Sequence, residues 1–219
     1  MTHDAASDFV SAYLRVNGYF MLRDLELHLR DDAAYRAVTD VDVVAIRHRT
    51  PSGPVHYRDT PGVVECLLAD EVDPALGVAT DRCDLIIGEV KRGKAEFNPA
   101  LRDPRVLHGV FRRIGDVFGA DDIDHVIDEL AARGRVLTPG AQVRLVAFGH
   151  GGSVAHGMSV SLTHLVDWLS DALARHHGLY EVSRFSDPVL SLLALMSRLG
   201  VPLRTSSLSP SGNKRKEGN

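Results

Sequence analysis

The chain has 219 residues, of which 44% are hydrophobic and 25% charged, and its formal net charge is −4. This length suits one domain with a sizeable core and is too short for two full ones. The negative charge argues against a protein that coats nucleic acid indiscriminately. No run approaches the roughly 18 apolar residues that span a bilayer, and the N-terminus lacks a signal-peptide pattern. We therefore expect a cytoplasmic protein without a membrane partner.

The first half of the chain combines one helix with three strands. Residues 4–18 place apolar side chains at helical spacing and end in Asn17-Gly18, a helix stop. Residues 19–29 switch to a period of two, and residues 39–49 and 83–93 are two further strand candidates. Turn sequences such as "TPSGP" and "DTPG" mark residues 50–80 as an insertion between them.

The second half is mainly helical around one more strand. A helix is predicted from Asn98, a plausible N-cap followed by Pro99, and a second at about 121–133. A strand at 141–150 and helices at 159–177 and 186–200 follow. Short loops favour antiparallel pairing of the first three strands, and the helical crossover allows a parallel fourth. The elements thus predict an α/β fold with a central mixed sheet of four to five strands flanked by helices.

We predict one domain over residues 1–203, with a core at about 5–150, the insertion at 50–80 and a C-terminal helical part at 158–200. Residues 204–219 have almost nothing to bury, so we expect a disordered tail. Apolar residues share one face of the last helix, and we expect them to join the core, with a homodimer contact as the alternative: Val189, Leu192, Leu193, Met196 and Leu199.

Two strand candidates carry acids where hydrophobic residues could stand. "TDVDVVAIRH" holds Asp40 and Asp42, which alternation places with Val44 and Ile46 and opposite Val41, Val43 and Ala45. "CDLIIGEVKRG" holds Glu89 and Lys91 on one face. If the strands pair, an acid of the first can meet the Glu-Lys couple of the second. Mg²⁺ commonly takes one or two carboxylates plus substrate phosphate, so this assembly suits metal-assisted hydrolysis of a phosphodiester.

A simpler interpretation of the Glu-x-Lys triplet is a cross-strand salt bridge worth about 0.2–1 kcal/mol. The rarity of lysine in this chain favours a catalytic role for Lys91 instead. Only four of the 25 basic residues are lysine, and two of these belong to the tail. Arginine pairs with carboxylates at least as well, whereas lysine can act as a compact charge or change its pKa. A salt bridge would not require the lysine at position 91, but a reaction could.

These residues and the element order resemble the PD-(D/E)XK nuclease superfamily, the restriction-endonuclease-like fold that includes Holliday junction resolvases. The resemblance covers roughly residues 5–150. It implies that Asp42 and Glu89 hold Mg²⁺ or Mn²⁺ together with the Val90 carbonyl, that Lys91 assists the attacking water, and that the substrate is DNA, with RNA as a possibility. No proline precedes Asp42.

Many members of that superfamily add a glutamate from the first helix. Here this helix offers only Asp4 and Asp8, so Glu26 or Asp40 could take that place.

Basic residues concentrate after the Glu-x-Lys triplet, although the whole chain is acidic. We expect phosphate contacts from Arg92, Lys94, Arg112 and Arg113, with solvated helix charges as the alternative for the last two.

Two other functions are compatible with the sequence. One is a catalytically silent nuclease-fold module that binds nucleic acid or a protein. The other is a metal-bound hydrolase using His150 and His156, although a plain glycine-rich turn explains that loop more simply.

Overall fold

The computed structural model describes residues 4–31, 34–49, 72–115, 123–178, 185–201 and 203, and the short strands β3 (Val55–His56) and β4 (Val63–Val64). Most of the predicted insertion and the predicted tail at 204–219 lie outside these residues. The chain divides into two compact units, residues 1–165 and 166–219, which are treated one at a time below. In the described residues no helix has the length and apolarity needed to traverse a bilayer.

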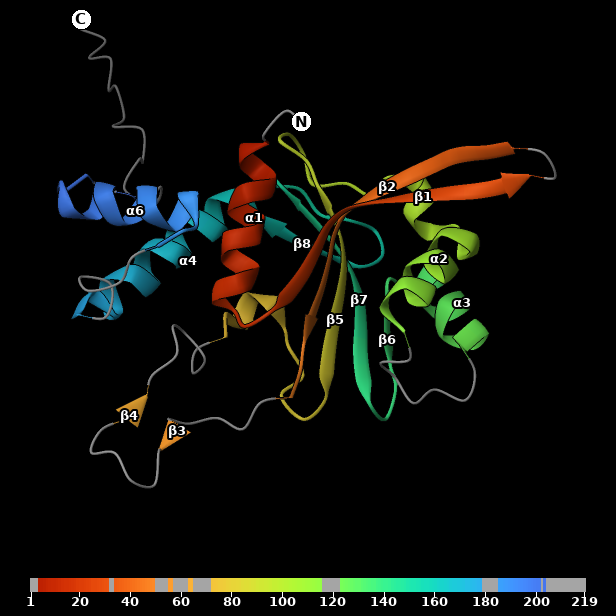
Figure 1. Cartoon of the computed structure of the whole chain (residues 1–219), viewed down its shortest axis with the longest axis horizontal. Helices are drawn as coiled ribbons and strands as arrows, with labels where there is room; N and C mark the ends of the chain where they lie inside the picture. The colour runs from red at the N-terminus through yellow and green to blue at the C-terminus, as the bar shows by residue number, and fades with distance from the viewer. Residues whose placement is uncertain are drawn as a thin grey trace, which may run out of the picture. The chain divides into compact units, whose positions relative to one another are not determined.

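The first unit is built on a mixed sheet in the order β1-β2-β5-β7-β6, with β8 also paired to β7 (Figure 1). Neighbours are antiparallel except for β5–β7 and β7–β8, which are parallel. The strands are β1 (Phe20–Asp31), β2 (Ala34–Arg47), β5 (Cys83–Val90), β6 (Arg135–Leu137), β7 (Ala141–Gly149) and β8 (Met158–Ser161). The α/β class and the mixed sheet are thus confirmed.

The sheet has two short strands beyond those predicted. β6 and β8 contain three and four residues, too few for a period of two to stand out in the sequence. β8 also corrects a helix boundary, because helix α4 (Leu162–Arg175) begins at Leu162 and not at 159. The Ser161 hydroxyl accepts the backbone N–H of His164, as expected of a helix-capping residue.

The helix predicted from Asn98 is divided into two. Asn98 caps a short 3-10 helix, η2 (Pro99–Arg102), and Asp103 then caps α2 (Pro104–Ile114) by accepting the N–H of Arg105. Proline at the first position of α2 suits a helix start but not a helix interior, so the chain begins a new helix there. α3 (Ile123–Arg133) follows close to its predicted place.

Helices cover both faces of the sheet. One face carries the main core, in which α2 and α3 pack on Leu85 and Ile87 of β5 and on Val143 and Leu145 of β7. The first helix, α1 (Ala5–Val16), packs against β1 and β5. It belongs to the opposite face, where the carbonyl of Asn17 at its end accepts a hydrogen bond from Arg47.

The β1–β2 hairpin changes face near its middle, has a register shift between Leu27 and His28, and continues past the sheet as a two-stranded ribbon (Figure 1). Its ladder pairs Leu22 with Val44 and Leu25 with Val41, and all four side chains belong to the same core. Strict alternation would have put Val41 on the face of Val43, so that prediction was wrong. The change falls at Asp24, whose φ of 52° lies in the left-handed region that side chains rarely adopt.

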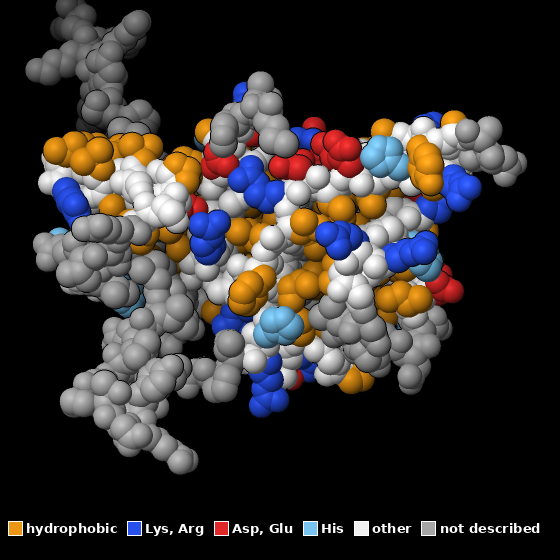
Figure 2. Space-filling model, viewed as in Figure 1, with side chains coloured by type: hydrophobic (Ala, Val, Ile, Leu, Met, Phe, Trp, Pro, Cys, Tyr) orange, Lys and Arg blue, Asp and Glu red, His pale blue; other side chains and the backbone are white. Residues whose placement is uncertain are grey.

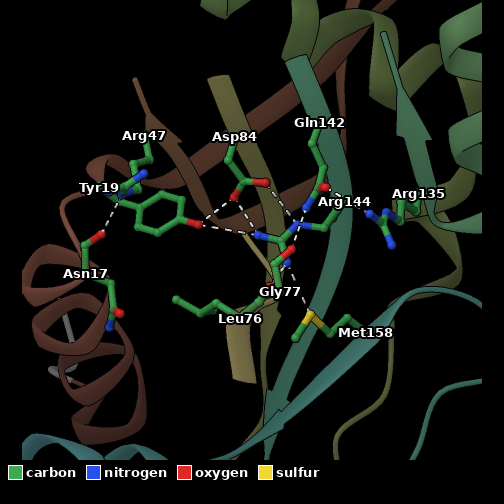
Figure 3. A network of polar contacts seen from close by, with 10 residues as sticks. All are labelled: Asn17, Tyr19, Arg47, Leu76, Gly77, Asp84, Arg135, Gln142, Arg144 and Met158. Atoms are coloured by element: carbon green, nitrogen blue, oxygen red, sulfur yellow. Dashed lines mark hydrogen bonds and ion pairs between the residues drawn. The ribbon is translucent and has the colours of Figure 1, made fainter. Parts of the chain in front are cut away.

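The opposite face holds a buried polar network around Arg144 of β7 (Figure 3). Its guanidinium binds both carboxylate oxygens of Asp84, at 2.5 and 3.1 Å, and also donates to the carbonyl of Leu76. The Tyr19 hydroxyl donates to the same carboxylate at 2.5 Å. Burial and the carboxylate raise the pKa of Tyr19, so it remains a donor. These bonds tie the short 3-10 helix η1 (Pro74–Leu76) to β5 and β7.

In the second unit, α6 (Pro188–Arg198) starts with its N-cap at Asp187, which accepts from two backbone N–H groups. The predicted apolar stripe is only partly buried. Val189 and Leu193 are buried, whereas Leu192 and Leu199 are 49% and 69% exposed. The expectation that the whole stripe joins the core is therefore wrong for these last two residues.

Candidate metal centre

The predicted Asp42, Glu89 and Lys91 meet where β2 separates from β5. The two strands pair from Arg47–Asp84 to Val43–Gly88, and Asp42 and Glu89 come next on their strands. Asp42 Oδ2 accepts the backbone N–H of Val90 at 2.6 Å, which bridges the gap that opens there. The structure therefore brings an acid of β2 against the Glu-x-Lys segment of β5.

Glu89 is a buried carboxylate that is only half satisfied. The residue is 3% exposed, and its Oε1 forms an ion pair with Nζ of Lys91 at 2.5 Å. Its other oxygen, Oε2, is buried and receives no hydrogen bond from the described residues. Burial raises the pKa of Glu89, and the negative charges of Asp42 and Asp40 raise it further, while Lys91 acts against them.

Asp42 lies in the same electrostatic field. Burial raises the pKa of this carboxyl, and the hydrogen bond from Val90 and the charge of Lys91 oppose that effect. Asp40 and Asp24 raise it further. Burial is thus the main cause of the raised pKa of both carboxyls, and the mutual repulsion of the acids adds to it.

Lys91 is the cation that faces these acids. The pKa of its ammonium is raised, first by the hydrogen bond to Glu89 and also by the charges of Glu89, Asp42 and Asp40. In this structure Lys91 is therefore a fixed positive charge and donor. The side chain is 39% exposed, so its ammonium remains within reach of a ligand.

Asp24 joins the acids at the site, and the sequence interpretation did not select it. It occupies the rung of the β1–β2 ladder opposite Asp42, between the Arg23–Val43 and Leu25–Val41 pairs. A signal was present, because the apolar positions of β1 change from even to odd between Leu22 and Leu25. Such a break in the period of two indicates a strand irregularity, which often lies near a functional site.

Glu26 and Asp40, the two suggested additional acids, face each other across the β1–β2 ladder. Both are exposed, and Glu26 has 77% of its side chain in solvent. They lie beyond Asp42 on the ribbon, where Figure 2 shows acidic side chains gathered near the point at which β1 and β2 leave the sheet. Asp40 is close enough to raise the pKa values of Asp42 and Glu89. Glu26 is the cross-strand neighbour of Asp40.

These residues fit a divalent cation with a small protein ligand set. Among the described residues no three His, Cys, Asp or Glu side chains form a group that could hold a metal by themselves. Mg²⁺ needs no such group, because it keeps several waters and uses one or two carboxylates plus substrate oxygens. Asp42 and Glu89 would supply the carboxylates and Val90 a carbonyl. The unpaired Oε2 of Glu89 is the feature that a cation would satisfy.

The four predicted phosphate-binding residues lie in different places. Arg92 is 73% exposed and forms an ion pair with Asp4 at 2.9 Å. Lys94 lines a pocket beyond the end of β5. Arg112 and Arg113 are exposed in the last turn of α2, and Arg113 lines a second pocket beside Phe20. Phe20 pairs with Ile46, four residues along β2 from Asp42.

The alternative histidine site gains no third ligand. His150 and His156 are both exposed in the loop between β7 and β8. Neither belongs to a metal-binding group in the part of the chain that the structure describes. The loop itself packs tightly on the segment after β5, and the backbone N–H of Ala95 donates to the carbonyl of Gly151.

Comparison with protein-family models, curated proteins and solved structures finds no match to this chain. The functional conclusion is therefore drawn from the site itself.

Proposed function

We propose that this protein is a metal-dependent endonuclease that hydrolyses phosphodiester bonds in DNA. The observation that carries the proposal is the half-satisfied Glu89, buried beside Asp42 and paired on one oxygen with Lys91. Buried polar groups normally have partners, so an orphaned carboxylate oxygen at a strand end calls for a ligand. Asp42, Glu89 and the Val90 carbonyl would hold a divalent cation, which would satisfy that oxygen and offset the negative charge of the acids.

The reaction is the displacement of one phosphate ester oxygen by water. The water oxygen bonds to phosphorus, the P–O bond to the leaving oxygen breaks, and that oxygen gains a proton while the water loses one. A bound Mg²⁺ or Mn²⁺ would lower the pKa of water and stabilise charge on the phosphate. The residues of the chain position the reactants around it.

Lys91 has two tasks in this scheme. Its ammonium donates hydrogen bonds to the attacking water or to a phosphate oxygen, and its charge stabilises the negative charge that builds up on the phosphate. The ion pair with Glu89 holds the ammonium in place at 2.5 Å. Lysine serves here as a compact donor, for which the larger planar guanidinium of arginine is a poor substitute.

The acidic surroundings would make a cation necessary for holding the scissile phosphate at the metal centre itself. Asp40 and Asp24 raise the pKa of Asp42, and Asp42 and Asp40 raise that of Glu89, so these acids would repel a phosphate at the centre in the absence of a cation. Basic residues nearby, including Lys94, attract the nucleic-acid backbone to the ends of the site. The sequence resemblance to PD-(D/E)XK nucleases, carried by Asp42 and the "EVK" triplet, also supports the proposal.

The test is a cleavage assay with the purified full chain. Supercoiled, linear, single-stranded and branched DNA, and an RNA of matched sequence, are incubated with Mg²⁺, Mn²⁺ or chelator. We expect cleavage with either metal and none with chelator, and we expect Glu89→Gln to remove it. Glu129 of α3, which is half-buried and pairs with Arg133, is changed to Gln as the matched control and should cleave like the parent. Absence of cleavage under every condition would favour the silent nuclease-fold module.

A further inference from the structure

A pocket of about 370 Å³ lies beyond the carboxyl ends of β5 and β7, next to the candidate metal centre. One side is formed by the segment from Lys94 to Pro99 and the start of η2, the other by residues 153–155 of the loop after β7. In open α/β sheets, ligands commonly bind in the crevice outside the carboxyl ends of the strands. The volume lies within the usual range for small-ligand sites.

The pocket adjoins the site through the chain that forms it. Lys94 is three residues from Lys91, a separation of at most about 11 Å. On the other side, Asn98 donates from its side chain to the hydroxyl of Thr39, the neighbour of Asp40. A strand bound at the metal centre therefore passes the pocket within about three nucleotides, at about 3.4 Å of rise each.

The two loops around the pocket are held firmly together, so the pocket exists before any ligand binds. The N–H of Ala95 donates to Gly151, and Gly149 lies so close to Ala95 that an added Cβ would stand 2.5 Å from its nitrogen. Gly157, with φ of 106°, allows the ring of Phe97 to approach its Cα. Tight packing of this kind produces a preformed pocket, which loses little entropy on binding.

The lining combines apolar surface with positive charge. Phe97, Pro99, Val154 and Ala155 supply the apolar walls. Arg102 is held over the ring of Phe97, 5.3 Å from its centroid, and also donates to the carbonyl of His156. Lys94 is exposed and adds a second charge, against the single acid Glu96.

We propose that this pocket receives an unpaired nucleotide of the substrate strand, with the base against the apolar walls and a phosphate between Lys94 and Arg102. The inference rests on the proposed nuclease function, since it deepens the substrate class of that site. A base in a duplex is stacked and paired and cannot enter a concave pocket, whereas an unpaired base can. Contact of bases with apolar and aromatic side chains tolerates any sequence. The substrate is therefore DNA with a single-stranded stretch beside the bond that is cut.

The test measures binding separately from cleavage. A labelled single-stranded 12-mer of thymidines and a 20-base-pair duplex are titrated with the full chain by fluorescence anisotropy, in chelator. Ala155→Trp fills the pocket, and Ala132→Trp places the same side chain on exposed α3 as the control. We expect Ala155→Trp to weaken single-strand binding about tenfold, and to weaken duplex binding much less.

A second variant keeps the test independent of the tryptophan. Lys94→Ala should weaken single-strand binding and lower its salt slope by about one, because one phosphate contact is lost. Arg133→Ala on α3 is its control. Three results would each overturn the pocket assignment. Ala155→Trp and Ala132→Trp could have equal effects, the single strand and the duplex could lose equal affinity, or the parent could fail to bind the single strand. Loss of cleavage alone would not, because the failure of the nuclease proposal leaves these binding differences in place.

Discussion

Strand β5 carries two buried carboxylates that the molecule treats differently. Asp84, near its start, is fully buried, and its two oxygens receive two bonds from Arg144 and one from Tyr19. Glu89, near its end, is 3% exposed and has Lys91 on one oxygen, and no described residue forms a hydrogen bond to the other. They occupy opposite faces of the sheet, five residues apart on one strand.

The difference separates an acid that stabilises the fold from the acid that we propose binds a metal. A buried charge is tolerated when its partner and hydrogen bonds compensate for the lost water, as they do around Asp84. Glu89 lacks that compensation, and its raised pKa records the imbalance. Under the proposed function, a bound cation would satisfy the remaining oxygen of Glu89.

Removing the satisfied acid should have the largest effect on stability. Asp84→Ala leaves the guanidinium of Arg144 buried without its counter-charge, so we expect a loss of about 3–5 kcal/mol in the free energy of unfolding. Urea denaturation followed by circular dichroism measures it. Asp81→Ala removes an exposed acid that pairs with Arg82, and its midpoint should stay near that of the parent. Similar midpoints for the two variants would contradict the structural assignment of Asp84.

Changing the partner of the unsatisfied acid should affect the reaction and not the fold. Lys91→Arg keeps the charge and can still bridge Glu89, so its stability should change by at most about 1 kcal/mol. We expect cleavage to fall about a hundredfold, the usual scale for a removed proton-transfer or donor group. The measurement is the single-turnover cleavage rate of Lys91→Arg relative to the parent. Arg133→Lys, the reverse substitution on helix α3, is the control. A Lys91→Arg enzyme of parental activity would leave only the salt bridge as the role of the lysine.

A divalent cation should stabilise the parent protein but not a variant that has lost the carboxylate of Glu89 or Asp42. A ligand present at ten times its dissociation constant adds about 1.4 kcal/mol to the stability of the state that binds it. We expect Mg²⁺ to raise the melting temperature of the parent, but not that of Glu89→Gln or Asp42→Asn, in differential scanning calorimetry. A rise of equal size in all three proteins would place the cation elsewhere.

The smallest expected effect concerns pH in the absence of metal. Because the folded state raises the pKa of Glu89, it binds that proton more tightly than the unfolded chain does. The contribution of Glu89 to stability is therefore full below its ordinary pKa and decreases as pH rises through the raised value. Glu89→Gln, measured in chelator by urea denaturation across this range, should lose that part of the slope. An unchanged slope would mean that Glu89 is not the group that titrates.

Local patterns in the sequence were enough for much of the fold. Strand patterns located β1, β2, β5 and β7. Helical spacing with a stop at Asn17-Gly18 located α1, the start signal before Pro188 located α6, and α3 also lies close to its predicted place. Failures occurred where an element was short, as in β6 and β8, or where a proline restarted a helix at Pro104. In each case the local pattern was weaker than the contacts that stabilise the element.

The sequence by itself determined that Glu89 and Lys91 are neighbours on one face of a strand, because two residues along a strand always share a face. Only the tertiary structure decided which distant groups they meet. The left-handed turn at Asp24 changes the face of the β1–β2 hairpin and adds an acid opposite Asp42, and the register of β2 on β5 leaves Glu89 with an unpaired oxygen. The ion pair between Asp84 and Arg144, which lie 60 residues apart in the chain, likewise depends on the parallel pairing of β5 with β7. Register and strand order arise from long-range packing, which a local pattern does not encode.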